Sequence, residues 1–267
     1  MNIQQWLNHA TKLLAQADIG TARLDCLILL EKALDRDRGW ILAHQEQLLA
    51  SEREQEFTKL LARRAKREPV AYISGICEFY GLQLEVTPEV LIPRVETEAL
   101  VSYVLHNAGT GAQIIDLGTG SGAIALALRS KRPDLKLVAS DESLKALAVA
   151  QRNAKKYSFH DIEFMQSNLM DDINARFDFI VANLPYLSDK EHYGPELAYE
   201  PVKALFSGPQ GLDHYRRLFP QVMSHIHKGG SIVIEAEPKQ AGPLDKLARE
   251  NGLSSVEHAN FLHIYRS

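Results

Sequence analysis

The chain has 267 residues, 45% of them hydrophobic, which is enough for one large core and a small second domain. Its formal net charge is −4 and its isoelectric point is about 6.2, so the overall charge does not favour nucleic acid or an anionic membrane as a partner. The N-terminus lacks a basic segment followed by an apolar one, and no apolar run approaches the ~20 residues of a membrane span. We therefore expect neither export nor a transmembrane helix.

Residues that often build disulfides or metal sites are sparse. Cys26 and Cys77 lie far apart in apolar surroundings, which argues against a disulfide framework or a cysteine metal site and fits a cytoplasmic location. His225 and His227 are two positions apart on a predicted helix, where side chains do not face each other. No metal site is expected.

The N-terminal part of the chain has the apolar periodicity of helices, which predicts a small all-α domain over residues 1–70. The role expected for this domain, partner recognition, is implied by the family resemblance given below. The basic cluster at 63–67 is interpreted as a solvated helix end, with its cations near the negative pole of the helix. Pro69 disfavours helix just before it. Beyond it, apolar residues around Gly75 and Gly81 favour extended structure, and we predict a β-hairpin linker over 71–92.

Strands and helices alternate over residues 93–267. Strands are predicted at 113–118, 135–141, 161–166, 177–183, 231–237 and, as a last strand, near 258–265. Helices are predicted from Thr97 to about His106 and at 123–131, 143–157, 212–227 and 241–251. This alternation predicts an α/β fold, a largely parallel, Rossmann-like sheet with helices on both faces.

A glycine-rich turn follows the first of these strands. It comprises Gly118, Thr119, Gly120, Ser121 and Gly122 and opens a helix whose free N–H groups face the turn. Its spacing fits the dinucleotide fingerprint poorly, because the third glycine comes two residues after the second instead of three. A purely structural turn between strand and helix is the alternative.

A carboxylate, Asp141, stands at the end of the next strand. At the carboxyl edge of the sheet it is placed to accept both ribose hydroxyls of a nucleoside that lies over the glycine turn. Asp141 is also suited to cap the helix that begins near Ser143, and the two roles are compatible. Together the turn and the acid predict a nucleoside cofactor without a pyrophosphate, which favours S-adenosyl-L-methionine over NAD.

The strand at 177–183 runs into Asn183, Leu184, Pro185 and Tyr186. By strand order this loop belongs at the same edge of the sheet as the glycine turn. The Asn183 side-chain oxygen and the Leu184 main-chain oxygen can each accept one N–H of a planar amino group, and Tyr186 can stack on its plane. Pro185 stiffens the loop. Such a site can catalyse by positioning and electrostatics.

These motifs resemble those of class I methyltransferases that alkylate amino nitrogens, and most closely the protein-(glutamine-N5) methyltransferases that act on peptide chain release factors, the HemK/PrmC family. The resemblance extends over almost the whole chain. It includes the segments 68–75, 78–82, 91–98, 23–25 with 29–30, 200–216, and Gly229–Gly230 with Glu235.

The resemblance implies a role for each matched residue. The glycine turn from Gly118 to Gly122, together with Asp141, Asn168, Leu169 and Asn183, would bind S-adenosyl-L-methionine. Asn183, Leu184, Pro185 and Tyr186 would hold the amide of a glutamine in a Gly-Gly-Gln loop of a release factor. Asn183, Pro185 and Tyr186 would be the catalytic residues, with direct transfer of the methyl group and neither metal nor covalent intermediate.

The chain departs from the family pattern at five positions. One of them is Glu237, which follows Ala236 where a glycine-containing turn is more usual. Leu184 replaces the first proline of the usual Asn-Pro-Pro-Tyr, but its contribution is a main-chain carbonyl, which survives. Val95 replaces a proline, Asn168 an aspartate near the adenine, and Leu169 stands where an aromatic residue is frequent. None of these changes removes a group that the chemistry needs.

Two other functions fit parts of this sequence. The loop at 183–186 also resembles that of N6-adenine methyltransferases acting on rRNA or DNA, whose substrate amino group has a similar shape. Those enzymes typically carry their extra domain after the catalytic one and need a basic surface, neither of which is predicted here. A partner-binding protein without catalysis is disfavoured because the glycine turn, Asp141 and Asn183 are all intact.

Overall fold

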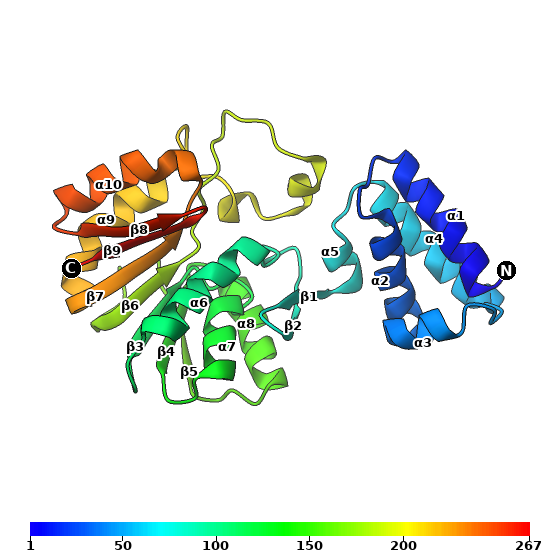
Figure 1. Cartoon of the computed structure of the whole chain (residues 1–267), viewed down its shortest axis with the longest axis horizontal. Helices are drawn as coiled ribbons and strands as arrows, with labels where there is room; N and C mark the ends of the chain where they lie inside the picture. The colour runs from blue at the N-terminus through cyan, green and yellow to red at the C-terminus, as the bar shows by residue number, and fades with distance from the viewer. The chain divides into compact units, whose positions relative to one another are not determined.

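The structure is a computed structural model that describes residues 1–267, and it divides the chain into two compact units. The helical unit comprises Met1–Ile76 and Gly194–Tyr199, and the α/β unit comprises Cys77–Tyr193 and Glu200–Ser267. Each unit is coloured along the chain in Figure 1. No helix is long and apolar enough to cross a membrane.

The helical unit is all-α, as the apolar periodicity predicts. Its helices are α1 (Ile3–Gln16), α2 (Ala22–Leu34), α3 (Arg38–Ala43), α4 (Ser51–Ala65) and α5 (Val70–Ser74). Asn2 begins α1 with a capping box, in which its side chain accepts a hydrogen bond from the Gln5 N–H and its own N–H donates to the Gln5 side-chain oxygen. Asp37 caps α3 by accepting from the Trp40 N–H. A single apolar cluster fills the space between these helices.

The basic cluster at the end of α4 is not a simply solvated helix end, so the sequence interpretation is wrong for Arg64. This side chain is buried, and its Nε donates to Asp25 Oδ2 at 2.6 Å. Arg64 and Arg67 also pair with Glu196, from the second segment of the same unit. Paired burial explains the difference, because a buried guanidinium needs an anionic partner.

Helix α5 corrects the prediction of extended structure directly after Pro69. Proline is tolerated at the start of a helix because it has no N–H to satisfy there, and Pro69 stands at the N-cap of α5. Gly75 ends the helix with φ +81°. The hairpin then forms from β1 (Ile76–Phe79) and β2 (Leu82–Glu85), with positive φ at both residues of its two-residue turn.

The α/β unit contains a seven-stranded sheet in the order β5-β4-β3-β6-β7-β9-β8. The strands are β3 (Gln113–Leu117), β4 (Lys136–Asp141), β5 (Ile162–Gln166), β6 (Phe177–Ala182), β7 (Ile226–Glu235), β8 (Ser254–Ala259) and β9 (Leu262–Arg266). The pairs from β5 to β7 are parallel, while β9 and β8 are antiparallel. The predicted α/β fold with a largely parallel sheet is confirmed.

Helices cover both faces of this sheet, as Figure 1 shows. On one face α6 (Glu98–Asn107), α7 (Ala123–Lys131) and α8 (Leu144–Lys156) pack on a core that includes Ile114. On the other, α9 (Asp213–His225) and α10 (Ala241–Glu250) pack on a core that includes Ile115. Neighbouring residues of β3 therefore point into opposite cores, as the twofold period of a strand requires. Short 3₁₀ helices are η1 (Val95–Thr97), η2 (Pro195–Tyr199), η3 (Val202–Ala204) and η4 (Pro238–Gln240).

The C-terminal end holds two strands where one was predicted near 258–265. The chain reverses between β8 and β9 at Asn260, whose φ is +54°, a conformation that asparagine tolerates better than most residues. All six residues of β8 are exposed, so the strand carries no apolar alternation that would reveal it in the sequence.

Strand order reverses at β3, which has β4 on one side and β6 on the other. In open α/β sheets, such a switch point opens a crevice at the carboxyl ends of the strands. The residues that follow β3, β4 and β6 are the glycine turn, Asp141 with its neighbours, and the loop that begins at Asn183. The fold thus brings the three predicted motifs to one edge.

Candidate active site

The glycine turn links β3 to α7 with three left-handed residues. Gly118, Gly120 and Gly122 have φ values of +68°, +55° and +85°, which side chains would strain. A Cβ atom on Gly118 would come within 3.0 Å of Leu184 Cδ2, and one on Gly122 within 2.9 Å of Leu126 Cδ1. A Cβ on Gly120 would meet no atom closer than 4.0 Å, so the backbone there is open to a ligand.

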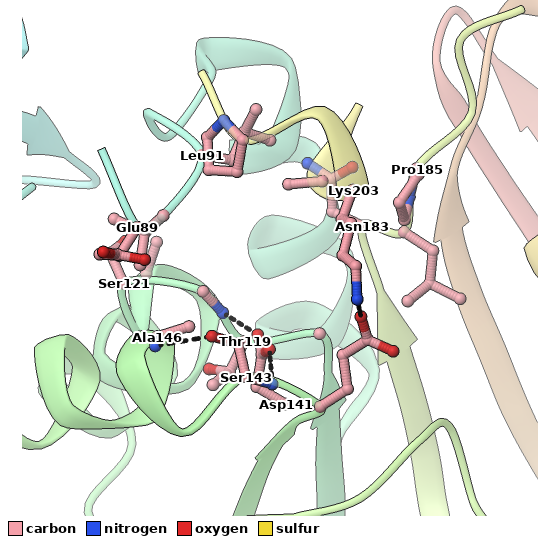
Figure 2. Close-up of a pocket in the computed structure, with 18 of the residues that line it drawn as sticks. Glu89, Leu91, Thr119, Ser121, Asp141, Ser143, Ala146, Asn183, Pro185 and Lys203 are labelled. Atoms are coloured by element: carbon pink, nitrogen blue, oxygen red, sulfur yellow. Dashed lines mark hydrogen bonds and ion pairs between the residues drawn. The ribbon is translucent and has the colours of Figure 1, made fainter. Parts of the chain in front are cut away.

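Asp141, the last residue of β4, binds the glycine turn and caps the next helix at the same time. Its Oδ2 accepts from the Gly120 N–H and its Oδ1 from the Ser143 N–H, both at 2.9 Å. Ser143 in turn accepts from the Ala146 N–H, which starts α8. Burial raises the pKa of Asp141, and the two N–H donors oppose that shift. Figure 2 shows Asp141 beside Thr119 and Ser143.

A second carboxylate, Asp116, lies under the turn and was not among the predicted site residues. Its Oδ2 accepts from the Thr119 hydroxyl at 2.6 Å and from the Ala125 N–H at 3.1 Å. Its Oδ1 is buried without a hydrogen-bond partner. Burial raises the pKa of Asp116 to about 6. A buried carboxylate oxygen without a donor is a place where a cationic ligand group would be stabilised.

The loop after β6 holds Asn183 in a defined orientation. Its Nδ2 donates to Thr97 Oγ1 at 2.9 Å, and that hydroxyl donates to Glu235 Oε2 at 2.6 Å. Glu235 ends β7, the strand that pairs with β6, so its carboxylate stands next to the loop. Asn183 lines the pocket, and its Oδ1 accepts no hydrogen bond from the chain.

Tyr186 turns its hydroxyl to the same glutamate. Its Oη donates to Glu235 Oε1 at 2.9 Å, so both carboxylate oxygens of Glu235 are occupied. Burial, and then the negative charge of Glu235, raise the pKa of Tyr186 well above its usual value. Burial likewise raises the pKa of Glu235, opposed by the hydrogen bonds from Thr97 and Tyr186. The phenol therefore stays neutral and acts as a donor.

One pocket of the α/β unit brings most of the predicted residues together. The predicted residues that line it are Gly118, Thr119, Gly120, Ser121, Asp141, Asn168, Leu169, Asn183, Leu184 and Pro185. Figure 2 shows Asn183 and Pro185 across the pocket from Ser121. Two predicted residues do not line it. Gly122 packs against α7 and α8, and Tyr186 directs its hydroxyl to Glu235.

The pocket also has lining residues that were not among the predicted site residues. They are Glu89, Leu91, Pro93, Thr97, Lys203 and His214, among others. Burial lowers the pKa of His214, whose Nδ1 lies 2.7 Å from Ser207 Oγ. Glu89, Leu91 and Pro93 come from irregular segments, which carry no periodic signal in the sequence. Thr97 ends η1, Lys203 lies in η3, and His214 lies in the first turn of α9.

At one end of the pocket, Asn168 and Leu169 follow β5. Arg217 Nη2 donates to Asn168 Oδ1 at 2.9 Å, so the amide offers its Nδ2 as a donor for a further partner. Leu169 is buried and has φ +55°, an uncommon conformation for a leucine. This end of the pocket therefore combines an apolar side chain with a hydrogen-bond donor.

Thr97 and Glu235 are the polar residues of this site whose roles the sequence did not reveal. They are 138 positions apart, and only the pairing of β7 with β6 brings Glu235 to the loop. The sequence did carry one signal, a glutamate directly after the apolar run at 232–234. A charge there is costly unless the fold supplies partners.

Comparisons with known proteins show which family the chain resembles. The model of the PrmC N-terminal domain matches residues 5–75, and that of the methyltransferase small domain matches residues 95–208. A release factor glutamine methyltransferase of Coxiella burnetii is 36% identical over 258 residues, which cover 96% of this chain and 90% of that protein. The chain belongs to the release factor glutamine methyltransferase family. The membership predicted from the motifs is thereby confirmed.

Other relatives agree with this family. A release factor glutamine methyltransferase of Koribacter versatilis is 37% identical over 94% of this chain and 91% of its own length. Among solved structures, a methyltransferase from Pyrococcus furiosus superposes with a TM-score of 0.53 at 17% identity, covering 81% of this chain and 98% of that one. That likeness supports the class I methyltransferase fold of the family.

Proposed function

We propose that this chain transfers the methyl group of S-adenosyl-L-methionine to the N5 side-chain nitrogen of the glutamine in the Gly-Gly-Gln motif of peptide chain release factors. The observation that carries the proposal is that the glycine turn with Asp141 and the Asn183–Pro185 loop line a single pocket. Family membership supplies the substrate class, since the relatives are named for release factor glutamine.

The residues around the glycine turn fit the proposed cofactor. The open backbone at Gly120 leaves room for its methionine portion. Each carboxylate oxygen of Asp141 accepts one N–H and keeps lone-pair capacity for a ribose hydroxyl. These features support a nucleoside cofactor without a pyrophosphate.

The far end of the pocket suits an adenine. With its oxygen held by Arg217, Asn168 presents an N–H donor, which matches a ring nitrogen of adenine better than its exocyclic amino group. Leu169 supplies an apolar surface where an aromatic residue is frequent in the family. We therefore propose a donor contact from Asn168 to the ring instead of the acceptor contact that an aspartate would make.

On the substrate side, Asn183 Oδ1 and the Leu184 main-chain oxygen would each accept one N–H of the glutamine amide. These two acceptors would increase the electron density on an amide nitrogen whose lone pair is delocalised, and would orient it. Pro185 limits the motion of the loop, and Tyr186 would pack against the amide plane. When bound, the cofactor supplies an electrophilic methyl group on its sulfonium. Catalysis on the protein side is therefore positioning and electrostatics.

We also propose that the helical unit recognises the release factor. It exposes the leucines Leu13, Leu24, Leu42 and Leu48, of which Leu48 is 76% exposed. Replacing Leu42 and Leu48 together by glutamate should raise KM for intact release factor and leave KM for a short Gly-Gly-Gln peptide unchanged. Equal effects on both substrates would contradict this role.

The reaction is best tested by transfer of a labelled methyl group from S-adenosyl-L-methionine to purified release factor, with mass-spectrometric mapping of the product. Parallel reactions with rRNA and DNA test the N6-adenine alternative. We expect label on the glutamine of the Gly-Gly-Gln motif alone. Label on RNA or DNA, with none on the release factor, would refute the proposal. Free thiols at Cys26 and Cys77 fit the expected cytoplasmic setting, so the assay should contain a reductant.

A further inference from the structure

A chain of hydrogen bonds joins the substrate loop to Glu235. Asn183 Nδ2 donates to Thr97 Oγ1 at 2.9 Å, Thr97 Oγ1 donates to Glu235 Oε2 at 2.6 Å, and Tyr186 Oη donates to Glu235 Oε1 at 2.9 Å. Thr97 is 4% exposed and Glu235 is fully buried. The glutamate thus holds both ends of the Asn183–Tyr186 loop, one end directly and the other through a hydroxyl.

The direction of each hydrogen bond is determined by the chemistry of Glu235. An ionised carboxylate only accepts, and a threonine hydroxyl has one proton to give. Because Thr97 gives its proton to Glu235, its oxygen is left only as an acceptor toward Asn183. The Asn183 amide must therefore turn its NH₂ group to Thr97. Its carbonyl oxygen then points away from Thr97 and has no protein donor.

The opposite orientation would be harmful to methyl transfer. An NH₂ group presented to the substrate would meet the N–H groups of the glutamine amide, donor against donor, and the nitrogen would lose one of its two acceptors. An asparagine side chain can rotate about its last bond with little intrinsic preference, so a neighbour has to select the orientation. In this structure that neighbour is Thr97, and Glu235 selects the orientation of Thr97.

We propose that Thr97 and Glu235 are positioning residues for methyl transfer, which hold the Asn183 amide with its carbonyl oxygen toward the substrate nitrogen. This inference rests on the proposed function, because it assumes a planar N–H donor as substrate. The pair acts through Asn183 and Tyr186 and need not touch the reacting atoms. Its effect is on the turnover of bound substrate, not on the affinity for the cofactor.

The main test compares Thr97→Val with Thr97→Ser. Valine keeps the shape of the side chain and removes the acceptor, whereas serine keeps the hydroxyl. We expect kcat for the release factor to fall about 10–100-fold in Thr97→Val, the size of effect that small misplacements cause. The cofactor Kd from calorimetry should stay within about threefold, and Thr97→Ser should retain kcat within about threefold. Ser130→Ala, which removes a hydroxyl at the end of α7, is the control for folding.

A second variant tests the direction of the hydrogen bonds. In Glu235→Gln the new amide can donate to Thr97, which frees the threonine proton to donate to Asn183 Oδ1 and turns that amide around. We expect kcat to fall at least as far as in Thr97→Val, with a normal circular dichroism spectrum. If this variant fails to fold, the comparison of Thr97→Val with Thr97→Ser still tests the inference.

Several outcomes would overturn the inference. They are an unchanged kcat in Thr97→Val, a serine variant as defective as the valine variant, and a loss that appears only in the cofactor Kd. If the unaltered protein fails to methylate the release factor, the proposed function fails instead. The two failures are therefore distinguished by the activity of the unaltered protein in the same assay.

Discussion

The two sides of the pocket are built from different parts of the chain. The cofactor side, from Gly118 to Gly122 with Asp141, is made largely of main-chain groups, with Asp141 held by the N–H groups of Gly120 and Ser143. The substrate side, Asn183 to Tyr186 with Thr97 and Glu235, depends on side-chain atoms that contact each other. The first therefore requires a backbone conformation, and the second requires particular functional groups.

This difference explains why the two sides should respond differently to substitution. Main-chain donors are kept in most side-chain substitutions. On the cofactor side, therefore, only substitutions of the glycines or of Asp141 should disturb the site. On the substrate side, one missing hydroxyl or amide breaks a connected chain of hydrogen bonds. Substitutions on the cofactor side should change the cofactor Kd, and those on the substrate side should change turnover.

The largest effect is expected for Asn183→Ala. The variant loses an acceptor that would be used mainly in the transition state, so transfer should fall by at least about 10³-fold. Cofactor affinity should remain within roughly tenfold, because the glycine turn and Asp141 are untouched. Single-turnover transfer of labelled methyl and calorimetry measure the two quantities separately.

A suitable control for this variant is Asn107→Ala. Asn107 ends α6, and its side chain donates only to the Tyr103 carbonyl at the surface. Its loss should leave both transfer and cofactor affinity unchanged. Unaltered turnover in Asn183→Ala would show that the Asn183 amide takes no part in methyl transfer.

The next effect is a pH dependence of the free energy of unfolding, which we expect from Asp116 under the glycine turn. Burial raises the pKa of Asp116 to about 6, above the 3.8 of an unperturbed aspartate. The folded state therefore binds more protons than the unfolded state between about pH 4 and 6, and this contribution to stability is lost as the pH rises through 6. Its size is about 3 kcal/mol. In Asp116→Asn the contribution is absent.

Urea unfolding of both proteins from pH 4 to pH 7 measures this difference. The free energy of unfolding of the unaltered protein should fall relative to Asp116→Asn across that interval. Asp172→Asn, at an exposed aspartate, should follow the unaltered protein. Parallel curves for Asp116→Asn and the unaltered protein would show that Asp116 titrates normally.

The fold was largely predictable because its signals are local. Strand and helix alternation, apolar runs and glycine turns depend on neighbours in sequence, and they place the carboxyl edge of the sheet correctly. The missed elements lack such signals. Strand β8 is exposed along its whole length and is defined by its pairing with β9, while α5 has only five residues.

The site was predictable only in part, for the same reason. Gly118 to Gly122, Asp141 and Asn183 stand at strand ends, where local sequence reveals them. The roles of Thr97 and Glu235 depend on a contact between residues far apart in the chain. The burial of Arg64 is a similar case, since its partner Asp25 lies on another helix. Tertiary contacts of this kind leave no periodic pattern.

A smaller effect is expected for Asp141→Ala. Losing charged hydrogen bonds to the ribose should weaken cofactor binding by on the order of 1.5–3 kcal/mol, which corresponds to roughly 10–150-fold in Kd. Turnover at saturating cofactor should change much less. Calorimetry measures the Kd, with Asp172→Ala as a control of equal charge change. If affinity is unaffected, Asp141 is only a cap of α8 and a support of the glycine turn.

The smallest effect is expected for Leu184→Pro, which restores the proline common in the family. The Leu184 N–H donates to the hydroxyl of Tyr215, which in turn donates to the Glu235 carbonyl. Proline has no N–H, so the variant should lose about 0.5–1.5 kcal/mol of unfolding free energy. The main-chain oxygen of residue 184 is kept, and the loop becomes stiffer. Turnover should therefore stay within about threefold in the methyl-transfer assay. A loss of tenfold or more would mean that the Leu184 N–H, through Tyr215 and Glu235, also holds the substrate side in place.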